Sequence, residues 1–381
     1  MTIRYRNGAY EVVVHVGADP ITGKERRVSR TVRMAEQKRT PKEVLDLEAQ
    51  LRTEVGAGAH GGPKITVAEL LTDWLAQARP NLSPLTVRGY ERCIDNYLIP
   101  HIGAVRLEKL TPARLDRCYA DLMDHGGTDG APLQAKTVRQ AHAVLHRALQ
   151  RALRYRWITF NPASLAEAPK PKKTKLTIPT VEQIRQLIDT APNPDLALLI
   201  ALAAATGARR GELCGLRWTD VDLDAGTVLI CRAVLELDHQ LILADTKTDK
   251  DRAVALGPNM IATLRARHVT QARRALAAGV SLAPDGYILS DELDAALPLH
   301  PNLASDRFRR HARAQGLHVR LHDLRHAKVS HALQAGIAPN DVAASAGHES
   351  TKMTLDVYGH AMAAGVRAMG DILDLGISGA C

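Results

Sequence analysis

Six residues in the C-terminal half of the chain have side chains that bind phosphate or transfer protons. Arginine donates hydrogen bonds in pairs to phosphate oxygens, and lysine and histidine bind phosphate or move protons. A tyrosine oxygen can act as a nucleophile. Together they suggest chemistry on a phosphodiester. They are Arg209 in TGARRGE, Lys247 in TKTDKDR, His322 and Arg325 in HDLRH, His348 in AGHES, and Tyr358 in TLDVYGHA.

Other common sites match the sequence poorly. The glycine clusters GARRG and HGG lack the Gly-Lys-Ser/Thr ending of a Walker phosphate loop. His322 and His326 are four residues apart on a predicted helix, but no carboxylate or cysteine stands at a familiar third-ligand spacing. A Ser-His-Asp catalytic triad is also a poor match, because the sequence offers no nucleophile elbow to present the serine. We therefore expect neither a metal nor a cofactor.

The six motifs, in this order, resemble the tyrosine recombinases of the phage integrase family. The family pattern is Arg, Lys, His-x-x-Arg, His or Trp, then Tyr. One motif alone would be a weak signal, whereas the whole series in order is a strong one. The resemblance covers the whole chain and implies a multidomain, mainly α-helical protein with small β-sheets. It also implies a site-specific recombinase or integrase of a mobile element.

The resemblance assigns the central roles. Tyr358 would attack phosphorus and leave a 3′-phosphotyrosyl link with a free 5′ hydroxyl, which a different 5′ hydroxyl could reverse without ATP or metal. Arg209 and Arg325 would bind the oxygens on which charge grows. Arg210 is the weaker candidate, because the family arginine stands two residues after the glycine of TGAR. Glu212, one helical turn after Arg209, is expected to orient it.

The remaining roles concern protons and the phosphate oxygens. Lys247 would protonate the departing 5′ oxygen, with Lys250 as its competitor three residues later. His322 would take the tyrosine proton or hold a phosphate oxygen, and His348 would hydrogen-bond the scissile phosphate. The other tyrosine of the catalytic segment, Tyr287 in DGYILS, is interpreted as a core residue.

Three positions depart from the family pattern. Ala327 and Lys328 stand where the family usually has threonine and an apolar residue, and Ala346 stands where leucine is usual. We expect these changes to affect packing beside the pocket and to leave an active enzyme.

Residues 1–58 are predicted to form an arm-site DNA-binding domain. The stretches IRYRN, AYEVVVHVG and KERRVSRTVRM alternate as three antiparallel strands, and a helix should run from about Pro41 to Val55. Residues 1–42 hold ten Lys or Arg against four acidic residues. DNA contacts are therefore expected from this sheet, including Arg26, Arg27 and Arg30.

Residues 64–167 are predicted to form a helical core-site DNA-binding domain, in which Thr66 and Glu69 begin the first helix as a capping box. Its fourth helix, within residues 134–157, lies in a stretch with six Lys or Arg and no acid, and an uncompensated cationic face suggests a polyanion as partner. The connector APKPKKTKL continues this charge. Expected DNA contacts are Lys136, Arg139, Arg147, Arg151, Arg154, Lys172 and Lys173.

Residues 177–381 are predicted to form an α+β DNA breaking-and-rejoining domain with a C-terminal tail. Two helices, in TVEQIRQLIDTA and PDLALLIALAAATGARRGELCGLRW, precede short strands in AGTVLICRAV, QLILAD and RAVALG, and further helices follow. The tail after Tyr358 has an apolar stripe. We expect the tail either to pack on its own domain or, as the family implies, to exchange between protomers.

Composition agrees with a DNA-binding protein. The net charge is +9 and the pI about 9.4, which favours an anionic partner. The five cysteines form no CxxC pair, and no segment resembles a signal peptide or a membrane span, so we predict a cytoplasmic protein with reduced thiols. Expected partners are double-stranded attachment sites, a homo-tetramer on DNA and an accessory DNA-bending or excision factor. The alternatives are a type IB topoisomerase and a non-catalytic DNA-binding regulator.

Overall fold

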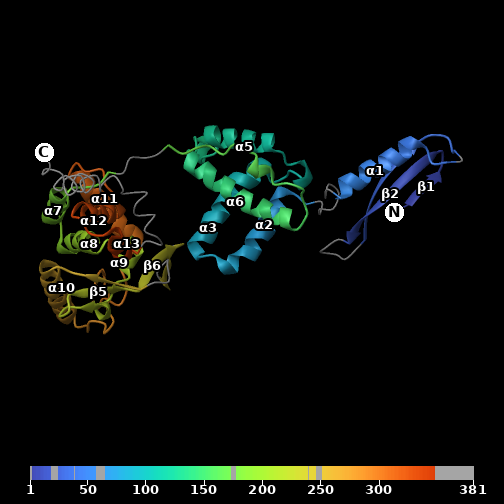
Figure 1. Cartoon of the computed structure of the whole chain (residues 1–381). Coiled ribbons are helices and arrows are strands. Elements are labelled where there is room, and N and C mark those ends of the chain that lie inside the picture. The colour runs from blue at the N-terminus through green and yellow to red at the C-terminus, as the bar shows by residue number, and fades with distance from the viewer. Residues whose placement is uncertain are drawn as a thin grey trace, which may run out of the picture. The chain divides into compact units, whose positions relative to one another are not determined.

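The computed structural model describes residues 2–18, 25–37, 39–56, 65–172, 177–238, 240–245 and 251–347. The chain divides into two compact units, Met1–Lys173 and Thr174–Cys381. Both contain helices and short antiparallel strands, which confirms the expected mixture (Figure 1). Across the described ranges, no helix has the length and apolar character that crossing a bilayer requires.

The first unit begins with a three-stranded antiparallel sheet in the order β1-β2-β3. Its strands are β1 (Thr2–Arg6), β2 (Ala9–Ala18) and β3 (Glu25–Arg33), and the helix α1 (Lys42–Gly56) follows. Alternate residues of β2, such as Val12 and Val14, are buried and pack with Val44 and Leu51 of α1. The period-two pattern of this strand therefore separates a covered face from an open one.

The helical part of the first unit is organised by α6 (Ala135–Arg154), whose apolar stripe from Val138 to Ala152 is buried. The other helices are α2 (Val67–Ala78), α3 (Pro84–Cys93), α4 (Ile99–Ile102) and α5 (Pro112–His125), and a π-helical turn at Ile94–Leu98 joins α3 to α4. The predicted capping box is confirmed, since Thr66 Oγ1 accepts from the Glu69 amide and Glu69 accepts from the Thr66 amide. Short 3₁₀ turns lie at Arg79–Asn81, Leu107–Lys109, Thr128–Gly130 and Pro162–Ser164.

The second unit contains the predicted catalytic segment. Its described helices are α7 (Val181–Asp189), α8 (Pro194–Thr206), α9 (Arg210–Cys214), α10 (Pro258–Ala277), α11 (Pro301–Ala314), α12 (Leu321–Gln334) and α13 (Pro339–Ala346). A 3₁₀ turn spans Trp218–Asp220. The strands β4 (Val221–Asp222), β5 (Thr227–Ile230) and β8 (Arg252–Ala255) form one sheet, and β6 (Arg232–Leu237) and β7 (Gln240–Asp245) form a hairpin.

Helix α8 is the centre of this unit. Its leucines and isoleucine are buried on several sides, and the same apolar cluster takes in Phe308 of α11 and Leu324 of α12. A helix buried in this way cannot shift without opening the core. The loop that follows α8, in which Arg209 lies, therefore starts from a fixed point.

Candidate active site

The TGAR loop turns sharply at the end of α8. Gly207 caps the helix with φ of 62°, a left-handed conformation that suits glycine. The Thr206 hydroxyl donates to the Leu202 carbonyl at 2.6 Å and accepts from the Ala208 amide at 3.1 Å, which fixes the turn. The loop thereby delivers Arg209 to the start of α9.

Arg209 is bound by Glu212, as the sequence predicted. The Arg209 amide donates to Glu212 Oε2 at 2.8 Å, and Arg209 Nη1 donates to Oε1 at 2.8 Å. The other terminal nitrogen, Nη2, donates to the carbonyl of Gly347 at 2.9 Å. About a quarter of the Arg209 side chain, 27%, remains exposed, so a ligand from solvent can reach it.

Arg252 is the second partner of Glu212, and sequence spacing did not identify it. Its Nη2 lies 2.5 Å from Glu212 Oε2, and its Nε donates to the Ser345 carbonyl at 3.1 Å. Burial alone would raise the pKa of Glu212, but hydrogen bonding and charge from Arg252, followed by bonds from Arg209, hold that pKa below its ordinary value. Glu212 therefore stays ionised between two arginines.

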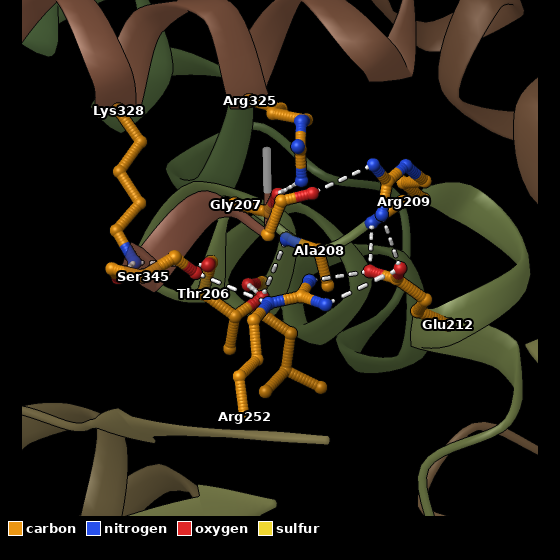
Figure 2. Close-up of polar contacts among 11 residues, drawn as sticks. Thr206, Gly207, Ala208, Arg209, Glu212, Arg252, Arg325, Lys328 and Ser345 are labelled. Carbon is orange, nitrogen blue, oxygen red and sulfur yellow. Dashed lines mark hydrogen bonds and ion pairs between the residues drawn. The ribbon is translucent and has the colours of Figure 1, made fainter. Parts of the chain in front are cut away.

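Arg325 approaches the same loop from α12. It is buried, and its Nη1 donates to the Gly207 carbonyl at 2.8 Å. Figure 2 shows Arg325 pointing toward Gly207, with Arg209 and Glu212 close by. The structure thus brings the two predicted phosphate-binding arginines to one loop, although they are 116 residues apart in the chain.

His322 lies one turn before Arg325 on α12, as predicted, and the residue is exposed. Desolvation at the helix surface, with the charges of His326 and Arg325, lowers the pKa of His322 to about 4. The His326 ring meets it edge-on with 4.8 Å between centroids. At neutral pH the His322 ring is therefore uncharged, and a pKa this low makes it a weak base in the free protein.

Three predicted catalytic residues lie outside the described residues. Lys247 falls between β7 and β8, His348 directly follows Gly347, and Tyr358 lies further on. The structure does place the residue before His348 beside Arg209. Tyr287 is buried, and its hydroxyl accepts from Arg217 Nη2 at 2.9 Å, which confirms its interpretation as a core residue.

The family departures concern more than packing. Ala327 and Ala346 are buried apolar residues, as expected. Lys328, however, sends its ammonium group to the Thr206 carbonyl at 2.9 Å and the Ser345 hydroxyl at 3.2 Å. The expectation that these positions affect packing only was therefore wrong for Lys328, because its polar end makes specific hydrogen bonds.

The N-terminal sheet places two of its predicted DNA-contacting arginines, Arg27 and Arg30, on different faces. Arg27 pairs with His15 on the open face and also bonds Glu25 at 2.7 Å. Arg30 pairs with Val12, so it stands on the face that α1 covers. The side chain of Arg26 lies outside the described residues. Arg27 and Arg30 therefore lie on opposite faces of the sheet.

Helix α6 corrects the idea of a wholly uncompensated cationic face. Arg151 is buried, and it donates to Asp73 Oδ2 at 2.6 Å and to Gln77 Oε1 at 2.8 Å. Arg147 is exposed and contacts the hydroxyl of Tyr90. Asp73 lies 78 residues earlier, which the charge count within one helix could not reveal. The remaining predicted contacts that the structure describes are exposed: Lys136, Arg139, Arg154 and Lys172; Lys173 lies outside the described residues.

No group of three His, Cys, Asp or Glu side chains suited to a metal ion occurs in the described part of the chain. The chemistry available at the site is that of two arginines, a neutral histidine and their supports. Such a set binds an anion and stabilises added negative charge on it.

Comparison with known proteins gives this site a family. Residues 178–364 match the model of the phage integrase family, and residues 66–123 match that of its N-terminal SAM-like domain. The tyrosine recombinase XerD of Neisseria meningitidis is 30% identical over 76% of this chain and 91% of its own length. The chain belongs to the phage integrase family of tyrosine recombinases. Enzymes of this family break and rejoin DNA strands, and the chain is such an enzyme.

Two further similarities extend over more of the recombinase. The ICEBs1 integrase of Bacillus subtilis is 26% identical over 97% of this chain and 98% of its own length. The Tn1549 transposon integrase, in complex with a circular intermediate DNA, superposes with a TM-score of 0.69 at 18% identity, covering 81% of this chain and 99% of that one. The second of these similarities supports the fold alone.

Proposed function

We propose that this recombinase is the integrase of a mobile element and that Tyr358 is its nucleophile. The observation that carries the proposal is the convergence of Arg209 and Arg325 on the loop at Gly207, with the residue before His348 bound to Arg209. Two guanidinium groups of this kind suit the growing charge of a phosphodiester under attack.

The proposed reaction exchanges one ester bond for another. Tyr358 Oη would attack phosphorus, and the bond from phosphorus to the 5′ oxygen would break. The 5′ oxygen takes the electron pair and receives a proton from Lys247, while the tyrosine proton passes to His322. In the free chain the pKa of His322 is lowered to about 4, and the negative charge of a bound phosphate would raise it toward neutral pH, which the acceptor role requires. His348 would hydrogen-bond a phosphate oxygen.

The rest of the chain is proposed to hold the DNA. Residues 1–58 would bind arm sites, 64–167 core sites, and 177–381 would catalyse strand exchange as a homo-tetramer. The matches of residues 66–123 and 178–364 support the second and third assignments. A lambda integrase tetramer bound to a Holliday junction, at 19% identity and a TM-score of 0.59, supports the assembly. An accessory DNA-bending or excision factor and action in the cytoplasm complete the proposal.

A nicked suicide duplex tests the nucleophile. We would offer the full chain a pool of nicked duplexes with randomised core sequence, separate protein–DNA adducts under denaturing conditions, and sequence the trapped DNA. A wild-type adduct that disappears in Tyr358→Phe is expected. An adduct that persists in Tyr358→Phe would exclude Tyr358, and no adduct with the wild-type chain would favour a non-catalytic regulator. Site-independent relaxation of supercoiled plasmid would favour a topoisomerase.

A further inference from the structure

Lys328 lies on the same helix as His322 and Arg325, three residues after Arg325. Figure 2 shows its side chain extending from α12 to Ser345 and Thr206, whereas Arg325 points to Gly207. The ammonium group donates to the Thr206 carbonyl at 2.9 Å and meets the Ser345 hydroxyl at 3.2 Å. Lys328 and Arg325, on one helix, therefore bind the carbonyls of two consecutive residues, Thr206 and Gly207.

The two partners of Lys328 stand at the ends of two helices. Thr206 is the last residue of α8, three residues before Arg209, and Ser345 is next to last in α13, three residues before His348. A helix C-terminus carries partial negative charge and free carbonyl groups, which a cation stabilises. One ammonium group thus joins the segments that lead to Arg209 and His348.

The surroundings make this lysine costly to keep charged. Among the described residues no carboxylate is in ion-pair contact with it, and the charged groups that act on it are Arg252 and Arg325. Burial, followed by these two cations, lowers the pKa of Lys328 to about 8. The packing is close as well, because a Cβ on Gly207 would lie 2.9 Å from Lys328 Cδ. The two hydrogen bonds of the ammonium group are therefore the described contacts that stabilise its charge.

We propose that Lys328 is a positioning residue of the recombinase. It fastens the C-terminal end of α13 to the C-terminal end of α8, so that Arg209 and the backbone at Gly347 keep their relative position. Its ammonium group is bound to the Thr206 carbonyl and the Ser345 hydroxyl, and in this proposal it touches no phosphate itself. This role rests on the proposed function, since it is exercised only if those residues act together on DNA.

The test compares cleavage with binding in the full chain. Lys328→Met keeps most of the side-chain volume and removes the ammonium group. With a duplex recovered from the trapped pool, we expect the rate of adduct formation at saturating protein to fall at least tenfold, because a small misplacement of catalytic groups costs that much. The DNA dissociation constant should stay within about twofold, since Lys328 makes no phosphate contact. Lys109→Met, at an exposed lysine of the first unit, controls for lost charge.

Two additional measurements separate positioning from other roles. If both residues act through the same contact, Lys328→Met with Ser345→Ala should cleave as slowly as Lys328→Met alone. A 5′-bridging phosphorothiolate substrate, whose thiolate leaves without a proton, should restore Lys247→Ala but not Lys328→Met. Restoration of Lys328→Met by that substrate would instead make Lys328 a proton donor. Melting of each variant above the assay temperature excludes unfolding as the cause.

The two proposals fail in different ways. If the wild-type chain forms the adduct and Lys328→Met forms it at the same rate, the role of Lys328 is overturned and the recombinase function stands. If the wild-type chain forms no adduct, the proposed function is overturned together with the role that rests on it.

Discussion

Replacing Arg252 with methionine should destabilise the second unit through Glu212. This carboxylate is only 1% exposed, and Arg252 contributes one of its shortest contacts, 2.5 Å to Oε2. Removing one partner of a buried ion pair typically costs about 3–5 kcal/mol, because the other charge stays buried. For a unit of this size that corresponds to a fall of roughly 6–20 °C in melting temperature.

The loss should depend on pH in a definite direction. Glu212 has a lowered pKa in the folded state, so its stabilising contribution is present above the unfolded value near 4.5 and disappears as pH falls through the folded value. Arg252→Met removes the leading cause of that lowering, and burial then raises the pKa. The difference in stability between wild type and variant should therefore be largest at neutral pH and shrink in acid.

Hydrogen exchange of the full chain in increasing urea, measured on peptides from α9 and β8, would report this loss in the second unit. The matched control is Arg265→Met, because the Arg265 pair with Asp224 is exposed and should contribute less than about 1 kcal/mol. Equal losses for the two variants, or a loss for Arg252→Met that grows in acid, would refute the reasoning.

Three further outcomes follow from the described contacts. Arg151→Met should destabilise the first unit by about 1–3 kcal/mol and leave the salt dependence of DNA binding unchanged, whereas Arg154→Met should reduce that salt slope by about 1; reversed effects would contradict the assignment. The His322 imidazole should titrate near 4 in the free protein by NMR and at higher pH with DNA bound, so that a lower bound-state value would exclude a phosphate beside it. Gly347→Ala should cost about 1–2 kcal/mol in thermal unfolding, since its φ is 66° and a Cβ would lie 2.8 Å from Arg252; an unchanged melting temperature would contradict this.

The sequence predicted those features of the structure that depend on residues close together in the chain. The Thr66–Glu69 capping box and the link from Arg209 to Glu212 each join residues three positions apart. Helix and strand periods likewise placed the main elements of both units. Local interactions of this kind can be predicted without knowledge of the fold. The turn at Gly207 was not predicted, because the sequence indicated one helix through this stretch and the structure ends α8 at Thr206.

Contacts between distant segments were not predictable in the same way. Arg252 reaches Glu212 across 40 positions, and Lys328 reaches Thr206 across 122. Nothing in the spacing of either residue signals its partner, because each contact arises only when separate elements pack. For Arg151 the sequence analysis made the opposite error: it counted the side chain as unpaired because α6 has no acidic residue, whereas Arg151 forms an ion pair with Asp73 of α2.

Helix α12 also limits how this chain can accept insertions and deletions. His322, Arg325 and Lys328 follow one another at intervals of three residues and meet different surroundings. One inserted residue between His322 and Lys328 would rotate everything beyond it by about 100° and detach Lys328 from two helix ends at once. The exposed turn after α10, around Gly279, carries no such register. Length variation among functional relatives should therefore accumulate there and be absent from the stretch between His322 and Lys328.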